Sequence, residues 1–347
     1  MFNNIQALRA VAAFLVVFVH LQAPLKALGL PSFGAEGVNL FFVISGFIMV
    51  ATTSRRPVTG SAFMLNRVAR IAPMYWLVTL AVALMAVFAP RLLGSTRVSG
   101  VELLKSLVFL PYRRGSGPME PVLFVGWTLN YEMAFYILFA VTLWLRRPFT
   151  RFLATAEVLI VLVVLGLLIQ GGDLWKFYTN QIVLDFAAGM MLGVLTPAIA
   201  RQAARTPRPL MWGAGAVMFL FLVVNEQILP SELSRAAACL ESTVLVACAL
   251  GLEATGARAR SPLVLALGDA SYSIYLLHPF VTQTVILLAR HELKPSIASA
   301  AGVVLVSLVA VALAGVAAHR WVETPLSRAA RDLLRARRLG PDDKRLA

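Results

Sequence analysis

The sequence predicts an all-α protein, a polytopic integral membrane bundle of about ten transmembrane helices. Of its 347 residues, 59% are hydrophobic and only 14% are charged, whereas about a quarter of the residues in soluble domains are charged. Its mean hydropathy is +0.79. The apolar residues form runs of about 20, the length at which a helix crosses the ~30 Å hydrocarbon core of a bilayer. These observations exclude a soluble globular protein.

The membrane spans are predicted from apolar runs that carry few charges and are bounded by polar residues. In chain order they cover residues 5–24, 37–53, 72–89, 124–145, 153–170, 177–199, 210–229, 236–252, 271–289 and 298–318. The first run is expected to remain as a helix, because Arg9 lies within it and no basic stretch precedes it. We therefore expect a single transmembrane domain over 1–320 and a basic cytoplasmic tail over 321–347.

The basic residues predict the orientation of these spans. The chain has 31 Lys and Arg against 17 Asp and Glu, a net charge of +14. With the N-terminus inside, 21 of the 31 basic residues fall on the cytoplasmic side, as the positive-inside rule requires, so both termini are expected to be cytoplasmic. Basic loops facing anionic lipid account for the surplus, and no nucleic-acid partner is expected. In the opposite loop, 90–123, the segment around Glu102 predicts an interfacial or re-entrant helix.

The two cysteines give no sign of a disulfide or a metal site. Cys239 and Cys248 lie nine residues apart in one apolar run, which places them on opposite faces of a helix and about 13 Å apart along its axis. No metal is expected.

Two ionisable residues on the first span form a candidate site. Arg9 and His20 lie 11 residues apart, which returns to within about 20° of the same helix face, with His20 about 16 Å deeper. Ionisable groups inside a membrane are costly and usually functional. The alternative is structural: Arg9 reaches lipid headgroups and His20 bonds a neighbouring helix.

The second span and the inner loop that follows it supply further candidates. Ser45, Gly46 and Phe47 interrupt the span with small residues, which permit close approach of a ligand or simply of another helix. Basic side chains in the inner loop form a possible phosphate clamp, or alternatively contact lipid. They are Arg55, Arg56, Arg67 and Arg70.

Four later spans contain polar groups that a bilayer disfavours. Glu132 lies among the aromatic residues Trp127 and Tyr136, and His20 is expected to be its partner. Around the ninth span, Ser271, Tyr275 and His278 are candidates, with a packing role for His278 equally open. Asp185 and Glu241 are further acids for which the sequence names no partner.

Six stretches together resemble the acyltransferase 3 family of integral-membrane O-acyltransferases, which modify bacterial surface and secreted carbohydrates. The resemblance covers most of the chain, and the Trp127 stretch looks most like the exopolysaccharide-production acetyltransferases. Asn39 departs from the family pattern, which often has Asp there. The stretches are Leu8-Arg9-Ala10 with His20, residues 37–47, Arg67-x-x-Arg70-Ile-x-Pro73-x-Tyr75, Trp127-Thr-Leu-x-x-Glu132-x-x-Phe135-Tyr136, Ser271-Tyr-Ser-Ile-Tyr-Leu-x-His278, and Val322-Glu323-Thr-Pro325.

The resemblance implies transfer of an acetyl group from cytosolic acetyl-CoA, or another acyl-CoA, to a glycan or lipid-linked oligosaccharide hydroxyl in the bacterial inner membrane. His20 is the expected general base, oriented by Glu132, with an acetylated His20 intermediate as the alternative. Arg9, Arg67 and Arg70 are expected to bind the donor phosphates. Acyl-CoA is a co-substrate, and no bound cofactor is expected.

Two other classes of function are open at this point. A transporter or glycan flippase also places ionisable residues at mid-membrane, although no inverted repeat is recognisable. A non-catalytic scaffold of a polysaccharide export complex is the third possibility. The sequence does not determine the acyl group, the acceptor hydroxyl or the oligomeric state.

Overall fold

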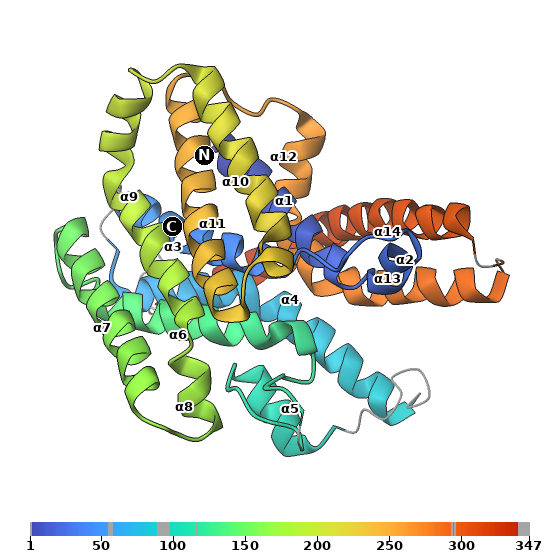
Figure 1. Cartoon of the computed structure of the whole chain (residues 1–347). Coiled ribbons are helices and arrows are strands. Elements are labelled where there is room, and N and C mark those ends of the chain that lie inside the picture. The colour runs from blue at the N-terminus through green and yellow to red at the C-terminus, as the bar shows by residue number, and fades with distance from the viewer. Residues whose placement is uncertain are drawn as a thin grey trace.

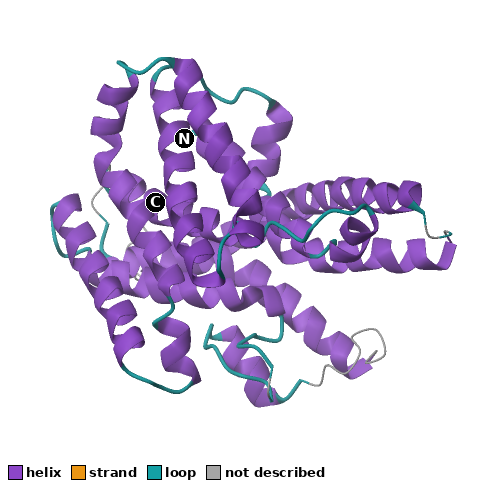
Figure 2. Ribbon diagram, viewed as in Figure 1, coloured by secondary structure: helices purple, strands orange, loops and turns teal. Residues whose placement is uncertain are grey.

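A computed structural model describes residues 2–54, 58–88, 98–115, 117–292, 294 and 296–338, except for the side chains of 232 and 335–338. Within these ranges the chain is helical and has no strand, which confirms the all-α prediction (Figures 1 and 2). The helices are α1 Asn3–Val19, α2 Gln22–Ala27, α3 Gly37–Thr53, α4 Gly60–Phe88, α5 Gly100–Leu107, α6 Trp127–Thr142, α7 Pro148–Leu168, α8 Asp173–Tyr178, α9 Leu184–Ala203, α10 Arg208–Ile228, α11 Ser231–Ala254, α12 Pro262–Asp269, α13 Ser271–Glu292, α14 Ile297–Ala318 and α15 Thr324–Arg338.

Each of the ten predicted spans coincides with a helix. Within the described ranges, eight helical segments are long and apolar enough to cross a membrane. They are Gly60–Phe88, Phe124–Thr142, Pro148–Leu168, Asp173–Ala203, Arg208–Ile228, Leu233–Ala254, Ser271–Glu292 and Ile297–Leu334. The remaining two predicted spans correspond to the shorter apolar helices α1 and α3. The chain is thus a multi-pass membrane protein, while the count of ten and the N-in, C-in orientation remain predictions.

Two helix boundaries differ from the expected spans in ways that matter for the site. Helix α4 begins at Gly60 rather than near residue 72. Residues 61–72 contain no Pro or Gly that would break a helix. The Thr59 hydroxyl also accepts a hydrogen bond from the Ala62 N–H (3.3 Å) at the start of the helix. Arg67 and Arg70 therefore lie on this helix, not in a loop. Helix α1 ends at Val19, so His20 lies in the turn before α2. The expected clamp residues Arg55 and Arg56 lie outside the described residues.

Helix α3 lies near the middle of the bundle and packs against α1, α9 and α11 (Figure 1). Its contact with α9 is close because glycines face backbone across it. A Cβ on Gly46 would lie 2.1 Å from the Phe186 carbonyl oxygen, and one on Gly189 would lie 1.9 Å from that of Val43. Small residues of this kind let helices in a bilayer approach until their backbones touch. This packing fixes the position of the α3 side chains that face away from α9.

The segments on either side of the bundle also have defined positions. Helix α5 confirms the helix predicted around Glu102, and it begins with a capping box between Ser99 and Glu102. At the other end, α14 continues through a π-helical turn, His319–Glu323, into α15. Helix α15 packs along α4, and the Ser327 hydroxyl donates to the Arg70 carbonyl (3.3 Å). The domain boundary expected at residue 320 therefore falls inside a continuous helix, and residues 339–347 lie outside the described residues.

The α3–α9 contact predicts a large effect of a single methyl group. Gly46→Ala is expected to lower the free energy of unfolding by about 1–3 kcal/mol, because the added Cβ must push the two backbones apart. Thermal unfolding in detergent measures this. Gly213 on α10 has no heavy atom within 4 Å of an added Cβ, so Gly213→Ala is the matched control and should leave stability unchanged or raise it. Equal melting temperatures for the two variants would contradict the close contact.

The predicted orientation is tested by labelling single cysteines in a background in which Cys239 and Cys248 are replaced by Ala. Ala204 at the end of α9 and Lys176 on α8 are both exposed and are predicted to lie on opposite sides of the membrane. Lys176→Cys should react with an impermeant maleimide in intact cells, whereas Ala204→Cys should react only after the membrane is opened. The reverse pattern would invert the bundle.

Candidate active site

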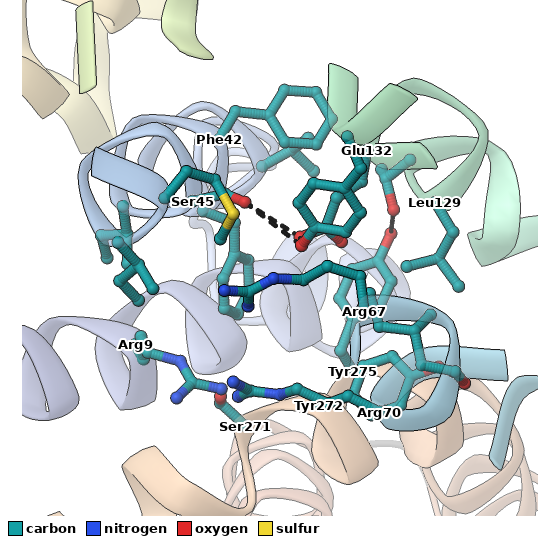
Figure 3. Close-up of a pocket in the computed structure, with 18 residues that line it drawn as sticks. Arg9, Phe42, Ser45, Arg67, Arg70, Leu129, Glu132, Ser271, Tyr272 and Tyr275 are labelled. Carbon is teal, nitrogen blue, oxygen red and sulfur yellow. Dashed lines mark hydrogen bonds between the residues drawn. The ribbon is translucent and has the colours of Figure 1, made fainter. Parts of the chain in front are cut away.

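A cavity of about 100 Å³ lies between α1, α3, α4, α6 and α13, and three guanidinium groups converge on it (Figure 3). We call it the arginine cavity, because Arg9 of α1 and Arg67 and Arg70 of α4 line it. The rest of its wall is aromatic or aliphatic, except for a few hydroxyl groups and one carboxylate, Glu132. The structure therefore brings together the three arginines predicted to bind the donor.

The guanidinium groups have few partners. Arg9 Nη1 donates to Gln6 Oε1 (2.8 Å), and Gln6 Nε2 in turn donates to Asp269. Arg67 lies over the rings of Phe63 (5.1 Å) and Tyr136 (5.7 Å), while its buried Nε has no hydrogen-bond partner in the described part of the chain. Among the described residues, none of the three arginines forms an ion pair within 4.0 Å. Unpaired guanidinium donors around one small space form a site for an anion.

Glu132 does not have the partner predicted for it. Its carboxylate accepts hydrogen bonds from Ser45 Oγ (3.0 Å) and from the Tyr136 hydroxyl one turn further along α6, so it faces α3 and the arginine cavity. The predicted Glu132–His20 pair is therefore wrong, because the depth of a residue in the bilayer does not fix which helix face carries it. Among the described residues that line the arginine cavity, Glu132 is instead the one carboxylate, and its charge acts on Arg9 and Arg67.

His20 is paired with a second histidine. Its Nδ1 lies 3.2 Å from His278 Nε2 and 3.2 Å from the Val16 carbonyl oxygen, and the Phe124 ring lies beside it at 5.5 Å. His278 is fully buried, and its Nδ1 lies 2.8 Å from the Tyr275 carbonyl oxygen. The expectation of a partner for His20 is met by a residue 258 positions away in the sequence.

These contacts fix the proton positions in the neutral pair. The Tyr275 carbonyl only accepts, so His278 Nδ1 carries the proton and His278 Nε2 is the acceptor. His20 Nδ1 must then carry a proton, which it shares between His278 Nε2 and the Val16 carbonyl oxygen. The lone pair of His20 lies on Nε2, which no described protein group uses. In this tautomer His20 is able to accept a proton from a ligand.

A second cavity, of about 350 Å³, adjoins the arginine cavity. Arg9, Ile48 and Arg70 line both. We call it the Glu323 cavity: the Glu323 carboxylate accepts from Ser273 Oγ (2.6 Å) and contacts His319 Nδ1 (2.9 Å). Asp269, Arg331 and Thr324 give this cavity a polar lining next to the arginine cavity.

The remaining predicted residues separate into lining and packing positions. Ser271 lines the arginine cavity with a hydroxyl that has no described partner. Tyr275 also lines it, and its hydroxyl donates to the Val125 carbonyl (2.8 Å). Trp127 lies away from this cavity, with its ring 5.9 Å from that of Tyr131. Gly46 and Phe47 are packing residues, with Phe47 fully buried against Phe2.

The structure supplies partners and residues that the sequence alone did not. The two acids without a named partner each accept from an amide: Asp185 from Asn39 (2.8 Å) and Glu241 from Asn225 (2.7 Å). Gln6 and Asp269, which hold Arg9, were not among the predicted residues. Gln6 lies three residues before Arg9, so helical spacing would have indicated it. Asp269 is distant in sequence, and nothing in the sequence links it to Arg9.

The fold and these cavities define a membrane-embedded protein with an anion site and an imidazole pair inside its helical bundle. The sequence matches the family described as "Acyltransferase domain" over residues 2–319. The chain belongs to this acyltransferase 3 family and is an acyltransferase, as the motifs predicted.

Curated relatives carry consistent names. The chain is 37% identical to the exopolysaccharide production protein ExoZ of Rhizobium meliloti over 86% of this chain and 91% of that protein. It is 26% identical to the acyltransferase MdmB of Streptomyces mycarofaciens (90% and 85% covered). Identity to nodulation protein 10 of Rhizobium leguminosarum is 27% (82% and 84% covered). The predicted likeness to exopolysaccharide-production enzymes is confirmed, and no solved structure matches the chain.

Proposed function

We propose that this enzyme moves an acetyl group from cytosolic acetyl-CoA to a hydroxyl of an exopolysaccharide or its lipid-linked precursor in the bacterial inner membrane. The observation that carries the proposal is the convergence on one cavity of three guanidinium groups that form no ion pair with any described residue. The proposed acceptor follows from the name of the relative at 37% identity, an exopolysaccharide production protein.

The donor is proposed to enter through the Glu323 cavity. Coenzyme A carries several phosphate charges, for which Arg9, Arg67 and Arg70 offer charge-assisted hydrogen bonds. Arg9 and Arg70 line both cavities, so they can hold phosphate at the entrance. The long neutral pantetheine arm suits the apolar wall of the arginine cavity beyond them. His20 is not among the residues that line this cavity, so the arm must extend past it for the thioester to reach His20 at the end of α1.

His20 is the proposed general base. Its Nε2 removes the proton of the acceptor hydroxyl while the hydroxyl oxygen forms a bond to the thioester carbonyl carbon, and the CoA thiolate leaves as the C–S bond breaks. The proton on His20 Nδ1 stays bonded to His278 Nε2 and the Val16 carbonyl, which holds the imidazole in the tautomer required for this step. His278 is thus a positioning residue. Glu132 lines the arginine cavity and has no part in orienting His20.

Transfer of radiolabel from [acetyl-¹⁴C]CoA tests the proposal directly. The acceptor probe is a set of de-O-acetylated oligosaccharides prepared from the exopolysaccharide of the host bacterium, and the enzyme is the full chain in membrane vesicles. Alkali-labile label on the oligosaccharides is expected. Transport of the oligosaccharides across the membrane without any label transfer would contradict the proposal and favour a flippase function.

The donor site predicts a specific kinetic change. Replacing both Arg67 and Arg70 by Ala is expected to raise the KM for acetyl-CoA by at least tenfold, since each charged hydrogen bond contributes ~1.5–3 kcal/mol. Lysine at either position should restore only part of the affinity, because it lacks the planar fork of arginine. Donor titrations measure both effects, with Arg290→Ala as the control in the outer end of α13. An unchanged KM in the double variant would leave the two arginines without a role in donor binding.

The base predicts an effect on turnover rather than on binding. His20→Ala is expected to lower kcat by about 10²–10⁴-fold, the usual contribution of a general base, while the protein still inserts and keeps its donor affinity. His291 is exposed at the end of α13, and His291→Ala should retain full activity. Wild-type turnover in the His20→Ala enzyme would contradict the role of His20 as the general base.

A further inference from the structure

A third cavity, of about 310 Å³, lies at the opposite end of α3 from the Glu323 cavity. We call it the Glu36 cavity, after the residue that precedes α3. Val38 lines both this cavity and the arginine cavity, so the two are separated by little more than one side chain. The volume is near the lower end of the range found for small-molecule sites, about 300–1,000 Å³. Neither the donor nor the base described above uses this space.

Glu36 is the unusual residue on its wall. The residue is only 4% exposed, and neither carboxylate oxygen has a hydrogen-bond partner in the described part of the chain. A buried polar group of this kind is costly and is normally satisfied. Burial raises the pKa of Glu36 to about 7, and the negative charge of Glu226 on α10 contributes to the increase. Near neutral pH the carboxyl group is therefore available both to donate and to accept a hydrogen bond.

The other walls are aromatic and amide-bearing. Trp127 and Tyr131 of α6 contribute rings set nearly at right angles, 84° apart. Asn39 and Asn180 contribute amide groups, and Glu226 stands at the more exposed edge. A sugar ring presents an apolar C–H face together with a rim of hydroxyls that both donate and accept. Aromatic rings complement the first, and carboxyl and amide groups complement the second.

We propose that the Glu36 cavity binds one sugar ring of the acceptor glycan, with Glu36 bonded to a ring hydroxyl and Trp127 against the ring face. This rests on the proposed function, because it takes a glycan to be the acceptor. An anionic headgroup would meet two acids, Glu36 and Glu226, and one cation, Arg235, on the cavity wall. The wall therefore has no surplus of positive charge to favour phosphate. Donor and acceptor then enter at the two ends of α3.

The test compares acceptor and donor kinetics in full-length enzyme with the de-O-acetylated oligosaccharides as the probe. Glu36→Ala is expected to raise the KM for the oligosaccharides about tenfold or more, because it removes the carboxyl group and the hydrogen bond that this group makes with the sugar. The KM for acetyl-CoA should not change. Glu226→Gln, which changes an exposed side chain, should act in the same direction and carries no risk to the fold. Glu292→Gln, an exposed acid at the far end of α13, is the matched control.

A binding measurement separates this inference from the proposed function. Ala35 lines the same cavity and is exposed, so Ala35→Cys, with Cys239 and Cys248 replaced by Ala, reports occupancy through its rate of maleimide labelling without any turnover. The oligosaccharides should slow labelling, and Glu36→Ala should remove that protection. Protection by phosphoethanolamine alone would assign the cavity to lipid and overturn the inference. Label transfer that is active in wild type with an unchanged acceptor KM in Glu36→Ala would also overturn it, while leaving the proposed function intact. Wild-type enzyme without any label transfer would instead refute the proposed function.

Discussion

Holding three guanidinium groups inside an apolar bundle is the constraint on which the rest of this structure depends. A buried charge is costly unless it is paired, hydrogen-bonded or hydrated, and Arg9, Arg67 and Arg70 have few protein partners. The protein offsets part of the cost with the Gln6–Asp269 chain below Arg9 and with the aromatic rings beside Arg67. The proposed donor would offset more of this cost, because its phosphate oxygens accept charge-assisted hydrogen bonds from guanidinium groups.

Helix α3 organises the site because it borders all three cavities in turn. Thr52 lines the Glu323 cavity, Ser45 the arginine cavity and Asn39 the Glu36 cavity. From Glu36 to Thr52 the rise of an α-helix is about 24 Å, most of a hydrocarbon core. The close packing of Gly46 and Gly189 holds this helix against α9, so its other side can line open space without the bundle collapsing. The packing of α3 against α9 therefore leaves the opposite side of α3 free to line the three cavities.

The sequence predicted what depends on local composition. Apolar runs placed every span on a helix, because hydrocarbon demands a fixed length of apolar helix whatever its neighbours are. The spacing of Arg67 and Arg70 placed them on one helix face. The local bond between Glu132 and Tyr136 at i, i+4 was available from helical spacing. Depth in the bilayer instead suggested His20 as the partner of Glu132, and depth says nothing about the rotation of a helix about its axis.

What the sequence could not predict are the contacts between distant helices. His20 and His278 are joined only because α1 and α13 pack together, and no spacing rule spans 258 residues. The same holds for Gln6 and Asp269, which meet because α12 packs on α1. For such pairs a single sequence gives the chemical type of each residue but no distance between them.

The position at which this chain departs from the family pattern illustrates how a helix pair balances its charge. Asn39 on α3 donates to the buried carboxylate of Asp185 on α9 at 2.8 Å. An acid at 39 would set two carboxylates at hydrogen-bond distance inside the bundle, where both cannot be ionised together. With an amide at 39, the single acid of the pair is carried by α9 and receives a neutral donor. The Asn39–Asp185 pair therefore joins α3 to α9 through a hydrogen bond while placing only one carboxylate at this contact.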